Sequence, residues 1–195
     1  MSHKPLPRPG GRSARVQQAV HAAVSALDDG EGRTQLTIPM IAEHAGVTPS
    51  TIYRRWGSLR ELLADVAAER LRPEAPLSDT GSLEEDLMVW AGEFMEEMTS
   101  RPGQQALADA LGSASHDPRT RCYDWQCEQI ALMLSRARDR GESSLPSVDT
   151  LIDGVMAPLL YRVSHAPESL SETRLRHWVR RALGSACENF RANTE

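Results

Sequence analysis

Thr37 to Trp56 reads Thr-Ile-Pro-Met-Ile-Ala-Glu-His-Ala-Gly-Val-Thr-Pro-Ser-Thr-Ile-Tyr-Arg-Arg-Trp, and this stretch predicts two short helices joined by a tight turn. Ala42 is small where the two helices must approach, and Gly46 supplies the positive φ that a sharp turn needs and a side chain would resist. Thr48 and Pro49 suit the N-cap and the first position of a new helix. The sequence therefore predicts a helix-turn-helix unit.

The second helix of this unit is predicted to present a cationic and aromatic face to solvent. With Ile52 packed inward against Ile41 and Val47, the opposite face at 100° per residue carries Pro49, Ser50, Tyr53 and Arg54. Side chains of these kinds contact base edges and phosphates, so the pattern predicts a DNA-reading surface. The alternative is a packed helical hairpin that binds no nucleic acid, and it leaves the run Tyr53-Arg54-Arg55 unexplained.

Charge is divided unevenly along the 195 residues. The net charge of −5 by itself argues against a nucleic-acid-binding protein. Residues 1–60 nevertheless contain eight Lys or Arg against four acids, whereas residues 61–195 contain 14 bases and 23 acids. Because residues 1–60 are basic and residues 61–195 are acidic, the attraction for phosphate is concentrated in the N-terminal part of the molecule.

Apolar residues follow helical spacing through most of the chain, and no stretch shows the alternation of a strand. Ser58 with Glu61 and Ser82 with Glu85 form capping-box signatures at two helix starts. Besides the turn unit, helices are expected over about 13–27, 58–72, 82–99, 103–111, 117–140, 148–164 and 171–190. The prediction is an all-α fold of about nine helices, preceded by a basic, Pro-rich segment over 1–11. That segment is either an arm that follows DNA or a solvated tail.

Several function classes find no support in the sequence. No apolar run approaches the roughly 20 residues needed to cross a bilayer, so a cytoplasmic protein without a membrane partner is expected. Cys122, Cys127 and Cys187 lack metal-ligand spacing and are interpreted as reduced thiols. No nucleophile elbow, phosphate loop or zinc signature occurs, so neither an enzyme, nor a cofactor, nor a metal site is expected.

The last two expected helices carry strong apolar stripes. Two such helices that meet their symmetry mates would form a four-helix bundle and a twofold homodimer. The alternative is that the stripes face only the core of their own protomer. The residues predicted for the dimer interface are Leu151, Val155, Leu159, Leu175, Trp178, Val179 and Leu183.

Aromatic and flexible apolar side chains gather in the expected helices after residue 82. They suit either a cavity for an apolar or aromatic effector or an ordinary core. The candidates for such a pocket are Trp90, Phe94, Met95, Met98, Trp125, Met133 and Tyr161.

Two runs, Ala42 to Thr48 and Thr51 to Trp56, followed by Ser58 at the start of a Leu-rich helix, resemble the DNA-binding domain of the TetR family of bacterial transcription regulators. The resemblance implies a DNA-binding domain with its connecting helix over 12–72 and a ligand-binding and dimerisation domain over 73–195. It places phosphate contacts at Thr37, Arg54 and Arg55. It places the remaining DNA contacts at Thr48, Pro49, Ser50, Thr51 and Tyr53.

Two positions depart from the family pattern. Leu59 stands where the family usually has a lysine that grips the DNA backbone, and Arg60 is expected to compensate only in part. Pro39 replaces a residue that is often a polar contact on the first helix of the pair.

The function expected from the residues and the resemblance together is a sequence-specific transcriptional regulator. It would be a repressor that an unidentified small molecule releases from a palindromic double-stranded DNA operator. The alternative is a helical small-molecule-binding or interaction protein that keeps the helix-turn-helix head without using it.

Overall fold

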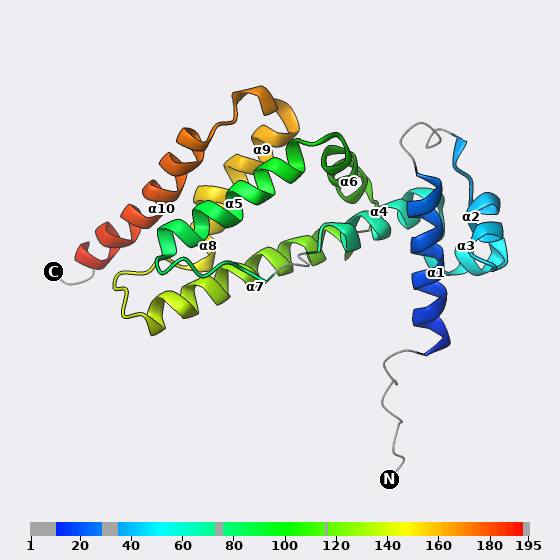
Figure 1. Ribbon diagram of the computed structural model, residues 1–195, viewed down its shortest axis with the longest axis horizontal. Helices are drawn as coiled ribbons and strands as arrows, with labels where there is room; N and C mark the ends of the chain where they lie inside the picture. Colours follow the sequence, from blue (N-terminus) through cyan, green and yellow to red (C-terminus); the bar gives the residue numbers. More distant parts are fainter. Residues whose placement is uncertain (1–10, 29–34, 73–75, 116, 193–195) are drawn as a thin grey trace, which may run out of the picture. The chain divides into compact units, whose positions relative to one another are not determined.

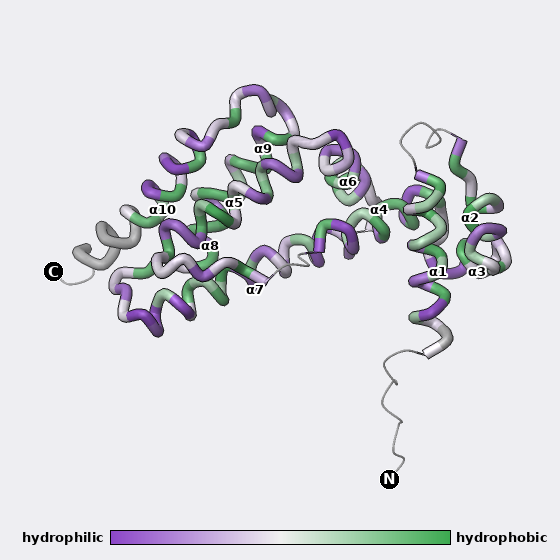
Figure 2. The backbone as a smooth tube through the Cα atoms, in the orientation of Figure 1, coloured by the Kyte–Doolittle hydropathy of each residue, from purple (hydrophilic) through white to green (hydrophobic). Residues whose placement is uncertain are grey.

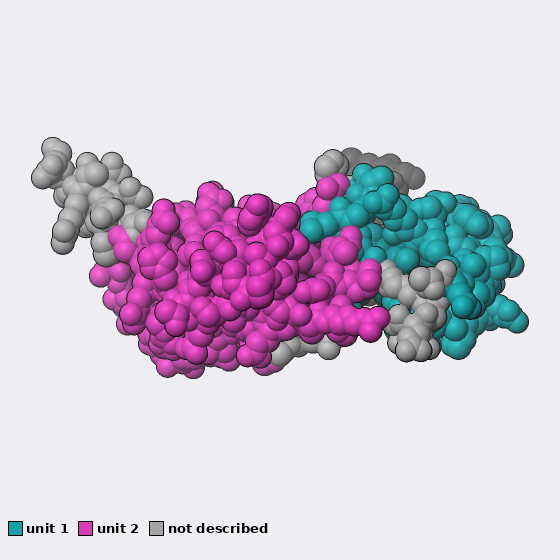
Figure 3. Space-filling view, turned by 90° about the horizontal axis from the view of Figure 1, so that it is seen from above, with its two compact units in different colours: residues 1–70, 109–118 teal, residues 71–108, 119–195 magenta. Residues whose placement is uncertain are grey.

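The computed structural model describes residues 11–28, 35–72, 76–115 and 117–192, with the side chains of Arg12 and of residues 185–192 left aside (Figure 1). The predicted arm over 1–11 therefore lies almost wholly outside the described residues. Within them, the regular structure is entirely helical, as predicted. The chain divides into two compact units, one of residues 1–70 and 109–118 and one of residues 71–108 and 119–195 (Figure 3).

The first unit is built on four helices, α1 (Arg12–Leu27), α2 (Ile38–His44), α3 (Pro49–Trp56) and α4 (Leu59–Arg70). Each helix buries one apolar side against a shared core, and this burial of one-sided helices supplies most of their stability. The fully buried side chains of this core include Val20, Ile41, Ala42, Ile52 and Leu62.

The turn between α2 and α3 has the geometry that the sequence predicts. Gly46 has a φ of +66°, and the Val47 N–H donates to the Ala42 carbonyl at 2.9 Å. Ala42 and Ile52 have no exposed surface, so the two helices meet directly at the small residue. This turn fixes where α3 begins and which side of it faces outward.

The second unit contains α5 (Leu83–Thr99), most of α6 (Arg101–Gly112) and α7 (Asp117–Asp139), α8 (Val148–Leu151), a π-helical turn η2 (Ile152–Met156), α9 (Ala157–His165), a 3₁₀ turn η3 (Pro167–Ser169) and α10 (Glu172–Ala192). Helix α10 packs on α5 and η2. Hydrophobic and hydrophilic stretches follow one another along these helices (Figure 2), as expected where apolar residues recur every three or four positions on one buried side. The continuous run from Val148 to His165 corresponds to the single helix predicted over 148–164.

Pro158 explains the π-helical turn inside that run. A proline in a helix interior has no N–H to donate and clashes with the carbonyl four residues earlier, here that of Gly154. The N–H of Ala157 instead reaches back five residues to the Ile152 carbonyl, which is the π pattern. At the same place Gly154 lies against α10, where an added Cβ would come within 3.0 Å of the Ala182 methyl.

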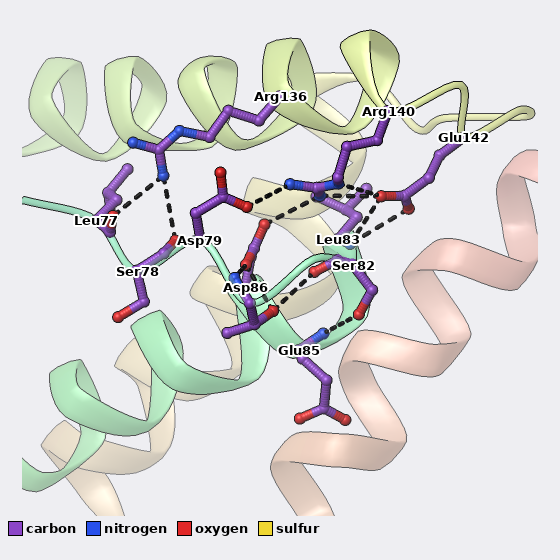
Figure 4. Close-up of polar contacts among 11 residues, drawn as sticks. Leu77, Ser78, Asp79, Ser82, Leu83, Glu85, Asp86, Arg136, Arg140 and Glu142 are labelled. Atoms are coloured by element: carbon purple, nitrogen blue, oxygen red, sulfur yellow. Dashed lines mark hydrogen bonds and ion pairs between the residues drawn. The ribbon is translucent and has the colours of Figure 1, made fainter.

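A buried carboxylate ties the start of α5 to the end of α7 (Figure 4). The Asp86 side chain is fully buried and accepts bonds from the Thr80 N–H and hydroxyl, both at 2.7 Å, and from Arg140 Nη2 at 3.1 Å. Arg140 also pairs with exposed Asp79 and with Glu142. Burial raises the pKa of Asp86, but the bonds from Thr80 and Arg140 outweigh it and hold the pKa below its ordinary value.

We predict that Asp86→Asn lowers the free energy of unfolding by about 3 kcal/mol at neutral pH, because it leaves Arg140 without its buried partner. The contribution of Asp86 is fully present above the ordinary aspartate pKa of about 3.9 and is lost as pH falls through the lower folded value. Denaturant titrations at pH 7 and below pH 4 measure both effects. Asp79→Asn is the matched control, because it removes an exposed partner of the same arginine and should cost less than about 1 kcal/mol.

We also predict that Gly46→Ala destabilises the protein by about 1–2 kcal/mol through backbone strain. An added Cβ would meet no atom within 4 Å at Gly46, so sterics add nothing to the cost. Gly92 is the control, because it lies within α5 with equally open space around it, and Gly92→Ala should stabilise by up to about 1 kcal/mol. Thermal unfolding of both variants compares them, and equal shifts would contradict the role assigned to the turn.

Candidate nucleic-acid interface

Two threonines precede the helices of the turn unit, and their hydroxyls behave differently. Thr37 Oγ1 accepts from the Met40 N–H at 3.4 Å and so caps α2. Thr48 occupies the N-cap position of α3, but its hydroxyl makes no capping bond to the backbone. Thr48 Oγ1 instead lies 2.9 Å from Ser50 Oγ and 3.0 Å from Thr51 Oγ1. The first turn of α3 therefore carries three linked hydroxyls.

The outward face of α3 contains all four residues that the sequence assigns to it. Pro49, Ser50 and Arg54 are exposed, and the Tyr53 side chain is 52% exposed. Ile52 and Trp56 are buried on the opposite face. Gly57, at a φ of +76°, ends the helix and donates to the Tyr53 carbonyl at 2.8 Å. Tyr53 and Arg54 thus form a polar and cationic ridge open to solvent.

Arg55 lies differently from Arg54, although the sequence assigns both to phosphates. Its Nη1 donates to the Ser13 carbonyl at 2.9 Å and to the Ser13 hydroxyl at 2.8 Å, and its Nη2 donates to Gln17 Oε1. The guanidinium carbon also lies 5.1 Å from the centre of the Trp56 ring. Arg55 is therefore engaged by α1 rather than directed away from the protein.

Asp65 of α4 is a residue that sequence reasoning missed. Asp65 Oδ2 accepts from the Trp56 indole N–H at 2.8 Å and lies 2.9 Å from His21 Nε2. One carboxylate therefore joins α1, α3 and α4. The one signal in the sequence was Trp56 itself, because a buried indole N–H usually needs an acceptor. Nothing in a single sequence identifies which acid supplies it.

The first turn of α4 makes half of the predicted capping box. Ser58 Oγ accepts from the Glu61 N–H at 3.2 Å, but the Glu61 carboxylate accepts from the Ser113 hydroxyl and, at 2.8 Å, from the Ala114 N–H. The bond from Ser113, followed by that from Ala114, lowers the pKa of Glu61. The segment between α6 and α7 thereby joins the first unit.

The two neighbours Leu59 and Arg60 lie on different sides of α4. Leu59 packs against the core of the first unit, which explains an apolar residue where the family usually has lysine. Arg60 is exposed. Its guanidinium lies beside Gly112, since its Nη2 would be 3.5 Å from a Cβ added to that glycine.

The described residues predicted for an effector pocket lie in different surroundings. Trp90, Met98 and Met133 are buried in the core of the second unit, with Phe94 and Met95 packed against it. Trp125 lines an open cleft of about 330 Å³ with Arg72, Leu77 and Gln129 among its other residues. Tyr161 is 66% exposed and stacks on His165 at 4.4 Å, so its assignment to a pocket is corrected.

The residues predicted for the dimer interface are mostly core residues of the protomer. Trp178 and Leu183 are only partly buried. The other five have at most 1% exposure, so they have no surface left to offer a second copy and their assignment is corrected. These five are Leu151, Val155, Leu159, Leu175 and Val179.

The described residues hold little that points to other chemistry. No group of three or more His, Cys, Asp or Glu side chains in this part of the chain is placed to hold a metal ion. Cys122 and Cys127 are free and partly buried, and burial raises the pKa of the Cys122 thiol. None of the described helices combines the length and the apolar character that a membrane crossing requires. Cys187 belongs to the segment whose side chains are left aside.

Comparison with known proteins agrees with this geometry. Residues 29–66 match the family model "Bacterial regulatory proteins, tetR family" and residues 77–182 match "Tetracyclin repressor-like, C-terminal domain". The transcriptional regulator AqdR of Rhodococcus erythropolis is 35% identical over 67% of this chain and 65% of its own. The uncharacterised regulator YdeS of Bacillus subtilis is 25% identical over 88% of this chain and 90% of its own.

A solved structure extends the likeness to the whole fold. The TetR family transcription regulator SCO0332 superposes with a TM-score of 0.63 at 26% identity, covering 88% of this chain and 96% of that one. The matched segments include α2, α3 and the exposed ridge of Tyr53 and Arg54. The chain therefore belongs to the TetR family and is a helix-turn-helix transcriptional regulator.

Proposed function

We propose that this regulator is a homodimeric repressor that reads a palindromic operator with α3 and is released by a small-molecule effector in the cytoplasm. The observation that carries the DNA-reading part is the exposure of Tyr53 and Arg54 beside buried Ile52 and Trp56. A phenol and a guanidinium held at the end of a rigid, half-buried helix gain nothing for the core. They supply the hydrogen bonds and charge that base edges and phosphates accept.

The other exposed groups around α3 have complementary roles in this proposal. Ser50 and Tyr53 reach base edges, and Pro49 offers an apolar contact to a thymine methyl. Arg54 and Arg60 supply charge to the DNA backbone. The hydroxyls of Thr37, Thr48 and Thr51 lie at the starts of α2 and α3, where they would face phosphates.

Dimerisation answers a geometric need of such a reader. Two copies of α3 fit successive major grooves when they lie about 34–36 Å apart, and a twofold axis produces this spacing on a palindrome. The apolar stripes of α9 and α10 are buried in the core of their own protomer. We therefore place the dimer contact on the outward faces of the same two helices. Tyr161, Trp178 and Leu183 retain surface there.

The cleft beside Trp125 is the proposed entry for an effector. Arg72 lies 6.0 Å from the Trp125 ring centre, and the Gln129 side chain accepts from the Trp90 indole at 2.8 Å, which links the cleft to the core. A ligand releases the repressor only if it binds the DNA-incompetent arrangement more tightly than the competent one.

We predict that Tyr53→Ala and Arg54→Ala each lower operator affinity about tenfold or more, because each removes an exposed group that contacts DNA. The operator is first identified by selecting bound sequences from random DNA, and affinity is then measured by fluorescence anisotropy. Arg70→Ala is the control, since Arg70 is an exposed arginine at the far end of α4. Unchanged affinity in both ridge variants would remove α3 from the interface.

We predict a particle of twice the 21.5 kDa chain mass at micromolar concentration, by sedimentation equilibrium. The partly exposed apolar residues of α9 and α10 give the association its free energy. Tyr161→Glu should weaken it, whereas Tyr123→Glu, at a similarly exposed tyrosine of α7, should not. A monomer at that concentration would contradict the proposal.

Retention on nonspecific duplex DNA separates this function from that of a helical interaction protein with an unused head. A DNA reader elutes at a salt concentration that reflects the phosphates it neutralises. A protein with an unused head would pass through the column even in dilute buffer.

A further inference from the structure

A polar stripe runs along α1 and meets the end of α3. Ser13, Gln17 and His21 are spaced four residues apart, so they lie above one another on one side of α1. Ser13 and Gln17 accept from the Arg55 guanidinium. We call these three residues, together with Arg55, Trp56 and Asp65, the α1–α3 brace.

Asp65 anchors the inner end of the brace. Its Oδ2 binds both the Trp56 indole N–H and His21 Nε2, and the His21 and Asp65 side chains are only 15% and 16% exposed. The His21 and Trp56 rings lie 6.1 Å apart, and Arg55 lies over the Trp56 ring. A hydrogen bond to a charged acceptor in a partly dry site is stronger than one in water.

The brace acts where α3 needs support. At eight residues α3 is too short to be stable by itself. The turn at Gly46 joins its start to α2, and the brace joins its last two residues to the longer helices α1 and α4. Tyr53 and Arg54 lie immediately before the braced residues, and a rotation of the end of α3 would displace both.

We propose that Asp65 and Gln17 are positioning residues for DNA reading, which hold Trp56 and Arg55 so that Tyr53 and Arg54 meet base edges in register. This inference rests on the proposed function. It assigns Arg55 to α1 and leaves the phosphate contact to Arg54, because both terminal nitrogens of Arg55 already donate within the protein. Loss of a positioning residue lowers affinity for the operator while leaving attraction to any duplex in place.

The decisive comparison uses two neighbouring glutamines. Gln17→Ala removes an acceptor of Arg55, whereas Gln18→Ala changes an exposed glutamine on another side of the same helix. We expect Gln17→Ala to weaken operator binding severalfold and to leave affinity for a nonspecific duplex within twofold. Gln18→Ala should change neither. The measured quantity is the ratio of operator affinity to nonspecific affinity, determined well below the melting temperature. A loss of stability alone would leave this ratio unchanged.

Asp65 is tested by two substitutions of similar size. Asp65→Leu keeps the branched shape of the side chain but removes the acceptor, and we expect about tenfold loss of the operator-to-nonspecific affinity ratio. Asp65→Asn can keep a carbonyl oxygen at the place of Oδ2, which accepts from the Trp56 indole and lies against His21 Nε2, so most of the ratio should return. Thermal unfolding shows whether each variant is folded at the assay temperature. If Asp65→Leu is unfolded there, the comparison of Gln17→Ala with Gln18→Ala still tests the inference.

The salt dependence of nonspecific binding distinguishes Arg55 from Arg54. Arg54→Ala should lower the slope of log affinity against log salt by about one, and Arg55→Ala should leave it unchanged. Equal slope changes would overturn the assignment of Arg55 to the brace.

The outcomes separate the inference from the function beneath it. If the unmodified protein selects an operator but Gln17→Ala and Asp65→Leu keep its affinity ratio, the positioning role is wrong and the DNA-reading function stands. If the unmodified protein prefers no sequence, both fall together. Loss of the ratio in both variants, with recovery in Asp65→Asn, supports the inference.

Discussion

An eight-residue helix such as α3 cannot keep its own orientation in water, and the first unit is organised around this constraint. Ile52 and Trp56 are buried on one side of α3, and their burial forces Tyr53 and Arg54 to the other side. The start of the helix is set by the positive φ of Gly46, and its end by Gly57. Both ends of α3 and its buried side are therefore fixed by the fold of the unit itself.

The second unit contains a proline within a continuous helical run, and its backbone accommodates that proline. Pro158 would break an ordinary helix, and in the π turn before it the Ala157 N–H donates to the Ile152 carbonyl five residues back. Gly154 and Ala182 then let η2 and α10 approach closely. Asp86 and Arg140 provide the polar counterpart, because a buried carboxylate is tolerated only where donors surround it.

The two adjacent arginines of α3 illustrate how position decides the role of a side chain. Both side chains are exposed, but Arg55, one residue and about 100° further round the helix than Arg54, donates to Ser13 and Gln17 of α1 and lies over the Trp56 ring. The same guanidinium group is thus assigned to the DNA backbone in our proposal for Arg54, and it makes bonds between helices in the case of Arg55.

The sequence by itself determined the all-helical fold, the turn at Gly46 and the outward side of α3, because helical periodicity and a glycine with positive φ are local properties. It also indicated the family, through the run from Ala42 to Trp56. Only the tertiary structure decided the partners of Arg55, Trp56 and Glu61, since these lie in α1, in α4 and before α7. It likewise decided that Leu151, Val155 and Leu175 face their own protomer, because an apolar stripe shows that a surface is buried without showing what covers it.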